Sequence, residues 1–152
     1  MKPALIDTDI LSRFFRADPN VVAHFARYLA EHGQLSISII TYYEVLSGLL
    51  HRDARKQLGA FRAFCDESEV LPLTPVAAHH AARLYAETRK AGTPVDDIDL
   101  LIAGIALAHG RMVVTHNTDH FGRLSGVTVE DWSAAQEQGE RAGPDSNGGR
   151  ST

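Results

Sequence analysis

The chain has 152 residues, a net charge of −4 and 44% hydrophobic residues, so it is long enough to fold as one domain around a buried core. Its single cysteine, Cys65, excludes an internal disulfide framework, and no apolar run approaches the length of a membrane span. The net negative charge argues against a protein that binds duplex nucleic acid by charge alone. The acidic Asp7 near the N-terminus argues against a signal peptide, so we expect a cytoplasmic protein.

Short apolar runs alternate with amphipathic stretches along the chain, which predicts strands alternating with helices. In chain order, the predicted elements are a strand over 4–6, a short helix over 10–15, a helix over 19–32, a strand over 35–40, a helix from 41, a helix through 58–64, a strand over 70–73, a helix over 75–91, a helix over 97–109, a strand over 112–115 and a strand over 127–129.

This alternation predicts parallel strands joined by helical crossovers, which is a three-layer α/β/α domain with a short central parallel sheet. We expect the domain to occupy residues 1–135. From 136 to 152 the composition shifts to Gln, Glu, Gly and Ser, which predicts a disordered tail.

Four acidic residues are predicted at the carboxyl edge of this sheet, where ligands of open parallel sheets bind. Asp7 follows the first strand, Glu44 lies in the helix after the second, Asp99 opens an apolar helix and Asp119 follows the strand over 112–115. Converging carboxylates repel one another unless a cation joins them, and hard oxygen ligands suit Mg²⁺ or Mn²⁺. The pattern therefore predicts a metal site.

Some of these acids also have plain structural interpretations. The run from Thr41 to Glu44 fits a capping box, in which Glu44 only satisfies a backbone N–H group. Asp97 fits the N-cap of its helix, whereas Asp99 lies inside the first turn, and Asp119 fits an ordinary turn.

Two histidines and a tryptophan need separate interpretations. The spacing of His116 and His120 permits a zinc pair, but the residues between them do not predict a helix that would align the two rings. Trp132 is predicted to pack in the core.

Four segments in register resemble a PIN-domain protein of the VapC type, found as toxins in type II toxin–antitoxin pairs. They are LIDTDIL at 5–11, TYYEVLSGL at 41–49, DLLIAGIA at 99–106 and VVTHNTDHF at 113–121, and the run VEDW at 129–132 resembles the family's ending. The resemblance spans about residues 3–132.

The resemblance implies a PIN-like fold and a metal-dependent endoribonuclease, with Mg²⁺ or Mn²⁺ as cofactor and RNA, often tRNA or rRNA, as substrate. It also implies a homodimer and a cognate antitoxin whose C-terminal segment blocks the cleft.

Carried over to this sequence, the resemblance implies that Asp7 and Asp99 ligate Mg²⁺ directly. Glu44 would hold the ion or its water, and Asp119 would bind a second ion or orient water. The supporting residues implied are Thr8, Thr115 and Asn117. Relatives often carry Arg or Asn where this chain has His116, so a contact between that position and the RNA backbone is open.

Two other functions are compatible with parts of this sequence. Asp7 and Asp9 also resemble the first motif of haloacid-dehalogenase-like phosphatases, but those enzymes carry Thr or Val where this chain has Leu11. The alternative without catalysis is a PIN-type RNA-binding module. The presence of all four acids argues against that alternative, because a degenerate site usually loses one.

Overall fold

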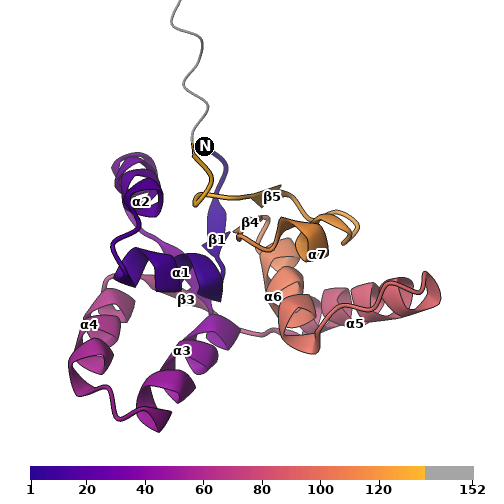
Figure 1. Ribbon diagram of the computed structural model, residues 1–152. Helices are drawn as coiled ribbons and strands as arrows, with labels where there is room; N and C mark the ends of the chain where they lie inside the picture. Colours follow the sequence, from indigo (N-terminus) through magenta and orange to yellow (C-terminus); the bar gives the residue numbers. More distant parts are fainter. Residues whose placement is uncertain (136–152) are drawn as a thin grey trace, which may run out of the picture.

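The chain forms five parallel strands in the order β3-β2-β1-β4-β5, with β1 at the centre (Figure 1). This computed structural model describes residues 1–135, and the tail predicted from 136 lies outside the described residues. The strands are β1 Ala4–Ile6, β2 Ser36–Ser38, β3 Glu69–Leu71, β4 Met112–Val114 and β5 Val129–Glu130.

Seven helices connect and cover the strands within the described part of the chain, and none of them is long and apolar enough to cross a membrane. They are α1 Thr8–Phe15, α2 Pro19–His32, α3 Ile39–His51, α4 Arg55–Asp66, α5 Pro75–Lys90, α6 Asp97–Ala108 and α7 Thr118–Gly122.

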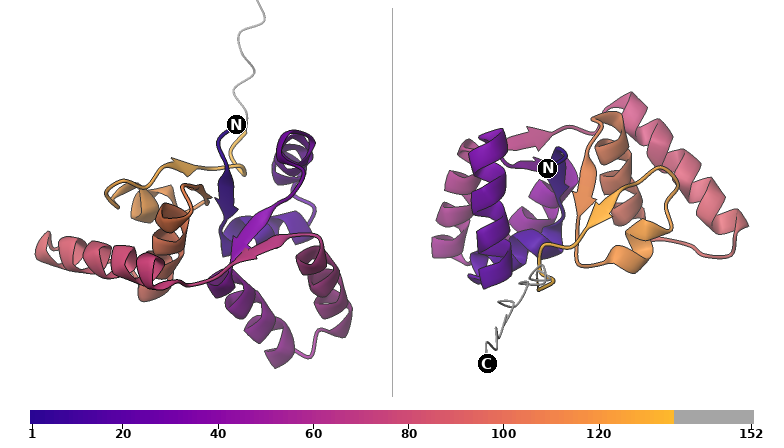
Figure 2. Two further views of the ribbon diagram at one scale, coloured as in Figure 1. Left: turned by 180° about the vertical axis from the view of Figure 1, so that it is seen from behind. Right: turned by 90° about the horizontal axis from the view of Figure 1, so that it is seen from above.

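The two faces of the sheet bury separate apolar clusters, because successive side chains of a strand point to opposite faces. In β1, Ala4 and Ile6 join the cluster beneath α1 to α4, whereas Leu5 joins the cluster beneath α5, α6 and α7. The helices accordingly form two separate groups in Figure 2. The predicted three-layer α/β domain with a short parallel sheet is confirmed.

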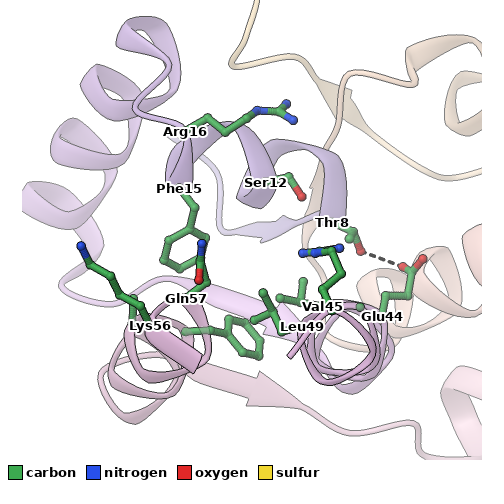
Figure 3. Close-up of a pocket in the computed structure, with 13 residues that line it drawn as sticks. Thr8, Ser12, Phe15, Arg16, Glu44, Val45, Leu49, Lys56 and Gln57 are labelled. Carbon is green, nitrogen blue, oxygen red and sulfur yellow. Dashed lines mark hydrogen bonds between the residues drawn. The ribbon is translucent and has the colours of Figure 1, made fainter. Parts of the chain in front are cut away.

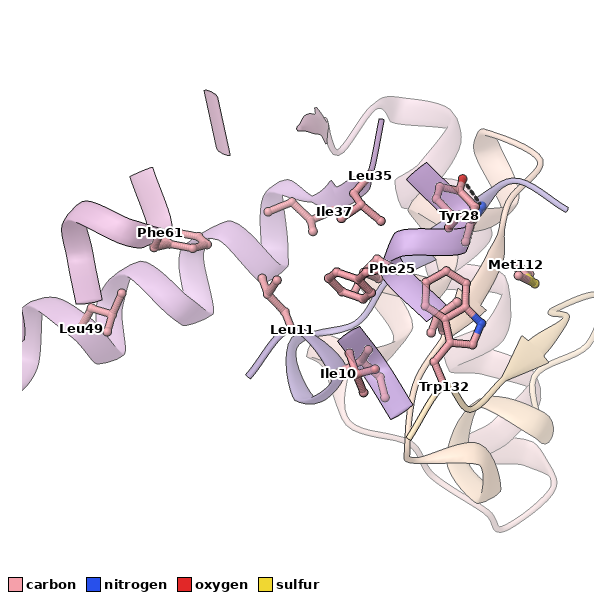
Figure 4. Close-up of a cluster of buried hydrophobic side chains, with 14 residues drawn as sticks. Ile10, Leu11, Phe25, Tyr28, Leu35, Ile37, Leu49, Phe61, Met112 and Trp132 are labelled. Carbon is pink, nitrogen blue, oxygen red and sulfur yellow. Dashed lines mark hydrogen bonds between the residues drawn. The ribbon is translucent and has the colours of Figure 1, made fainter. Parts of the chain in front are cut away.

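Trp132, whose side chain has no exposed surface, packs at one end of the cluster under α1 to α4 (Figure 4). Its indole lies 5.9 Å from the ring of Phe25 and 5.5 Å from that of Tyr28, measured between centroids. The core prediction for Trp132 is thus confirmed, and the residues after β5 belong to the same core.

The predicted starts of two helices and the predicted cap of a third were wrong, because side-chain caps lie elsewhere than the sequence suggested. Helix α1 begins at Thr8 with Asp7 as its N-cap, not at residue 10. Helix α3 begins at Ile39, since the Ser38 side chain accepts a hydrogen bond from the Thr41 N–H, and this shortens the strand predicted over 35–40. Helix α6 is capped by Asp96 rather than Asp97.

Candidate active site

The carboxyl ends of β1 and β4 meet at the centre of the sheet, where the chain crosses from one side of β1 to the other. Such a switch point is where open α/β sheets bind ligands. Asp7 leaves β1 there and is buried, with 6% of its surface exposed. Its Oδ1 accepts a hydrogen bond of 2.8 Å from the Thr8 N–H, and its Oδ2 accepts one of 2.8 Å from the Thr115 hydroxyl.

Asp9 is a second carboxylate at this switch point and was not among the predicted site residues. Its Oδ2 accepts a hydrogen bond of 3.1 Å from the His116 N–H, so the loop after β4 holds both acids. Its Oδ1 is buried and has no hydrogen-bond partner within residues 1–135. The signal in the sequence was the spacing from Asp7, which places the second acid in the first turn of α1.

Glu44 approaches the same edge from α3, where the Thr8 hydroxyl donates a 2.7 Å hydrogen bond to its Oε1 (Figure 3). The Thr41 hydroxyl lies 3.1 Å from that of Thr8 and completes the contact between the two helices. The capping-box interpretation of Glu44 was wrong, because Ser38 caps α3 and Glu44 lies beyond its first turn.

Asp99 lies in the first turn of α6 and is about half buried beside the other acids. Burial raises the pKa of Asp99, and the nearby charges of Asp96, Glu44 and Asp9 raise it further. His120 opposes this shift, with its Nδ1 3.8 Å from Asp99 Oδ2. The structure thus brings carboxylates from α1, α3 and α6 within electrostatic reach of one another.

Asp119 is the one predicted acid that lies apart. It is exposed on α7, and the structure gives it no hydrogen bond or ion pair within the described residues. The turn that precedes it is nevertheless ordered, since the Asn117 N–H donates to the Thr115 hydroxyl at 3.0 Å. Asn117 Nδ2 also lies 2.8 Å from His120 Nδ1.

The two histidines of this turn contact different carboxylates rather than a common point. His116 Nδ1 lies 3.0 Å from Asp131 Oδ2, whereas His120 faces Asp99. Helix α7 begins at Thr118, after His116, so the two rings do not share a helix face. The geometry gives no support to a zinc pair.

Burial and charge combine most strongly at Asp7. Burial raises the pKa of Asp7, the neighbouring charges of Asp9 and Asp99 raise it further, and the hydrogen bonds from Thr115 and Thr8 oppose the rise; the resulting pKa is about 7. The raised pKa means that the Asp7 carboxylate is disfavoured as an anion, and it lies beside the unpaired Asp9 Oδ1. A bound cation would stabilise the negative charge of both carboxylates.

The donor chemistry fits Mg²⁺ or Mn²⁺, which prefer carboxylate oxygens. Within residues 1–135, no group of three or more His, Cys, Asp or Glu side chains is placed to hold a metal ion. Mg²⁺ is commonly held by one or two carboxylates with water in the remaining positions, and this site can supply that number.

Known proteins share sequence with the chain over most of its length. The PIN domain family matches residues 4–127. The tRNA(fMet)-specific endonuclease VapC of Shigella flexneri is 32% identical over 130 residues, which cover 85% of this chain and 97% of that protein. The endonuclease of the same name from Salmonella typhimurium is 36% identical over 107 residues, covering 70% of this chain and 81% of that protein.

Solved structures resemble the chain over most of its length. In the DNA-bound VapBC complex of Salmonella typhimurium, the matching chain is 32% identical with a TM-score of 0.77, covering 87% of this chain and 99% of that one. In VapBC-1 of nontypeable Haemophilus influenzae, the match is 25% identical with a TM-score of 0.77, covering 86% and 98%.

The pKa of Asp7 predicts an unusual stability profile for the metal-free protein. Because the folded state holds the Asp7 proton more tightly than the unfolded state does, folding stability is lost as pH rises from about 4 to 7. Asp7→Asn removes this loss and keeps a good helix cap. In excess EDTA, the variant should be more stable than wild type by roughly 2 kcal/mol at pH 8, and the gain should shrink toward pH 5.

Urea unfolding at both pH values measures this difference. Asp119→Asn is the matched control, since its exposed carboxylate should give no comparable pH-dependent gain. A lower stability of Asp7→Asn at pH 8 would show that Asp7 acts as a structural cap rather than a strained carboxylate.

Proposed function

Because the chain belongs to the PIN-domain family and aligns with VapC endonucleases over most of its length, we propose that it is a divalent-metal-dependent endoribonuclease, the toxin of a type II toxin–antitoxin pair. The observation that carries the proposal is the buried Asp7 at the switch point, with Asp9, Glu44 and Asp99 within electrostatic reach. In the proposed reaction a water molecule, rather than a side chain of this group, attacks the phosphodiester.

Asp7 and Asp99 would hold Mg²⁺ or Mn²⁺, with Glu44 holding the ion or its water and Asp119 contributing through a second ion or a bound water. The unpaired Asp9 Oδ1 is a further oxygen available to the ion. A bound divalent ion supplies polarisation of a phosphoryl oxygen and lowers the pKa of a bound water.

The hydroxyl groups of this chain orient those carboxylates. Thr115 donates to one oxygen of Asp7 while the Thr8 N–H donates to the other, so the Asp7 carboxyl cannot rotate freely. The Thr8 hydroxyl engages only Oε1 of Glu44, so Oε2 remains available to a ligand. Asn117 keeps the Thr115 hydroxyl pointed at Asp7 by donating to its oxygen.

The relatives' names suggest which RNA to try first. Two of them are named tRNA(fMet)-specific endonucleases, so we propose tRNA as the substrate class to test before rRNA. We propose that the protein acts in the cytoplasm, where tRNA is found. Hydrolysis with water as nucleophile would leave a 5′-phosphate and a 3′-hydroxyl.

Purified protein should cleave RNA in Mg²⁺ or Mn²⁺ and stop in excess EDTA, because the clustered carboxylates need a cation to act on a phosphodiester. Gel analysis of end-labelled tRNA measures cleavage and the chemistry of the new ends. Equal cleavage in EDTA would contradict the proposal. Turnover of p-nitrophenyl phosphate through a phosphorylated Asp7 would instead identify a phosphatase.

Removing single negative charges should reduce cleavage without unfolding the protein. Asp99→Asn should nearly abolish activity, and Glu44→Gln should lower it by a factor on the order of 100, about 2.7 kcal/mol of transition-state stabilisation. Extra Mg²⁺ should restore part of the Glu44→Gln loss, because an amide is the poorer ligand. Glu67→Gln, at an exposed acid beyond α4, is the control and should cleave like wild type.

Full activity of Glu44→Gln at low Mg²⁺ would mean that Glu44 does not bind the metal ion and only accepts the hydrogen bond from Thr8. Thermal melts of all three variants separate loss of activity from loss of fold.

The partners proposed are an antitoxin and a second copy of this chain. Solved structures that resemble the chain are VapBC complexes, which supports an antitoxin partner. The outer face of α3 leaves large side chains exposed, with Tyr43 64% and Leu50 57% accessible. Leu73, which follows β3, and Val76, in the first turn of α5, are also exposed apolar side chains. Burial of these side chains favours a homodimer.

Light scattering after size-exclusion chromatography should therefore give the mass of two chains. Tyr43→Glu and Leu50→Lys should shift the protein toward one chain, because each places a charge on the apolar surface. Arg62→Glu, at an exposed position on α4, is the control for an added charge and should leave the mass unchanged. A single-chain mass for the wild type would contradict the homodimer.

A further inference from the structure

A cavity of about 750 Å³ lies between α1, α3 and α4 and begins at the candidate active site (Figure 3). Two of its lining residues, Thr8 and Glu44, are the hydrogen-bonded pair of the site itself. The cavity therefore continues the edge at which the carboxylates gather, away from β4 and along the helices.

The charged residues that line this cavity are mainly basic, although the protein as a whole is acidic. The chain carries a net charge of −4, yet three cations, Arg16, Arg52 and Lys56, line the cavity. Glu44 is the single acid among the residues that line it. Within residues 1–135, the side chains of the three cations have no hydrogen bond or ion pair, so their charges are free to meet an anion from outside.

The sequence of α3 directs one of these cations toward the site. Glu44, Gly48 and Arg52 follow one another at intervals of four, which places them on one face of the helix. The Arg52 Nη1 lies against Gly48, 3.4 Å from the point where a Cβ would stand. The guanidinium therefore folds back along α3 toward Glu44.

An exposed aromatic ring completes the cavity. Phe15, at the end of α1, is 42% exposed although its ring meets Phe61 and Phe64 edge-on, with centroids 6.4 Å and 5.6 Å away. These contacts hold the ring in place and leave part of it open to the cavity. Ser12 and Gln57 add polar groups beside it.

We propose that this cavity binds a single-stranded segment of the RNA substrate next to the scissile bond, with phosphates on Arg16, Arg52 and Lys56 and a base stacked on Phe15. Unpaired cations beside an exposed ring are the chemistry that binds single-stranded nucleic acid with little sequence preference. The inference rests on the proposed ribonuclease function. An acidic peptide is the rival occupant, and continuity with the carboxylates favours the strand to be cleaved.

Binding is measured separately from cleavage, using Asp7→Asn protein in excess EDTA and a short fluorescein-labelled RNA without internal base pairs. Fluorescence anisotropy gives the affinity and its dependence on salt. Replacing each of Arg16, Arg52 and Lys56 by Gln should weaken binding by roughly fivefold. The logarithm of the association constant falls as the logarithm of the salt concentration rises, and the triple substitution should make this fall shallower by about 2, since each phosphate contact on a single strand contributes about 0.7 to the slope.

Arg55→Gln is the matched control, because Arg55 lies next to Lys56 on α4, pairs with Asp53 and does not line the cavity. It should keep the affinity within about twofold of the parent. Phe15→Ala should weaken binding by roughly tenfold and Phe15→Trp should restore it, because stacking needs a ring rather than this particular side chain. Thermal melts exclude unfolding as the cause.

Unchanged affinity and salt slope in the triple variant would overturn the inference and leave the proposed ribonuclease intact if the wild type still cleaves RNA. If those substitutions instead weaken binding of an acidic peptide and not of RNA, the cavity belongs to a protein partner and the inference is also overturned. RNA binding that follows the predicted pattern, without cleavage in Mg²⁺, would overturn the ribonuclease proposal and not the cavity.

Discussion

The burial of one carboxylate at the end of the central strand is the constraint on which the rest of the site depends. Asp7 is the N-cap of α1, and its side chain accepts a hydrogen bond from Thr115 in the loop after β4. Its position therefore depends on how β1 and β4 lie side by side in the sheet. Its burial beside Asp9 costs free energy that a cation would offset. Keeping this carboxylate buried therefore holds negative charge at one point of the site and lowers the stability of the metal-free protein.

Hydrogen bonds from three separate segments keep the neighbouring acids at this point. Thr115 and the His116 N–H hold Asp7 and Asp9, and Thr8 reaches across to Glu44 on α3. The site is therefore a junction of α1, α3 and the loop after β4. The same junction opens into the cation-lined cavity, so the acids that would hold a metal and the cations that would hold phosphates share the Thr8–Glu44 edge.

Much of this arrangement could be predicted from local signals. The alternation of apolar runs predicts a parallel α/β sheet, and an acid directly after the first strand predicts a site at its carboxyl edge. Helix caps were less predictable, because Ser38 and Asp96 compete with neighbouring residues that also make good caps. That competition made Glu44 look like part of a capping box, although the helix begins two residues earlier than expected.

The sequence by itself thus determined the fold class, the order of all strands and of every helix except α7, and three of the four acids that converge, since these follow from periodicity and from position relative to strand ends. Only the tertiary structure brought Asp9 into the group and left Asp119 exposed, because both outcomes depend on how α1 and α7 lie against the loop after β4. It also decided that Arg16, Arg52 and Lys56 line one cavity. They come from α1, the end of α3 and α4, and no pattern in the sequence records the distance between helices that pack side by side.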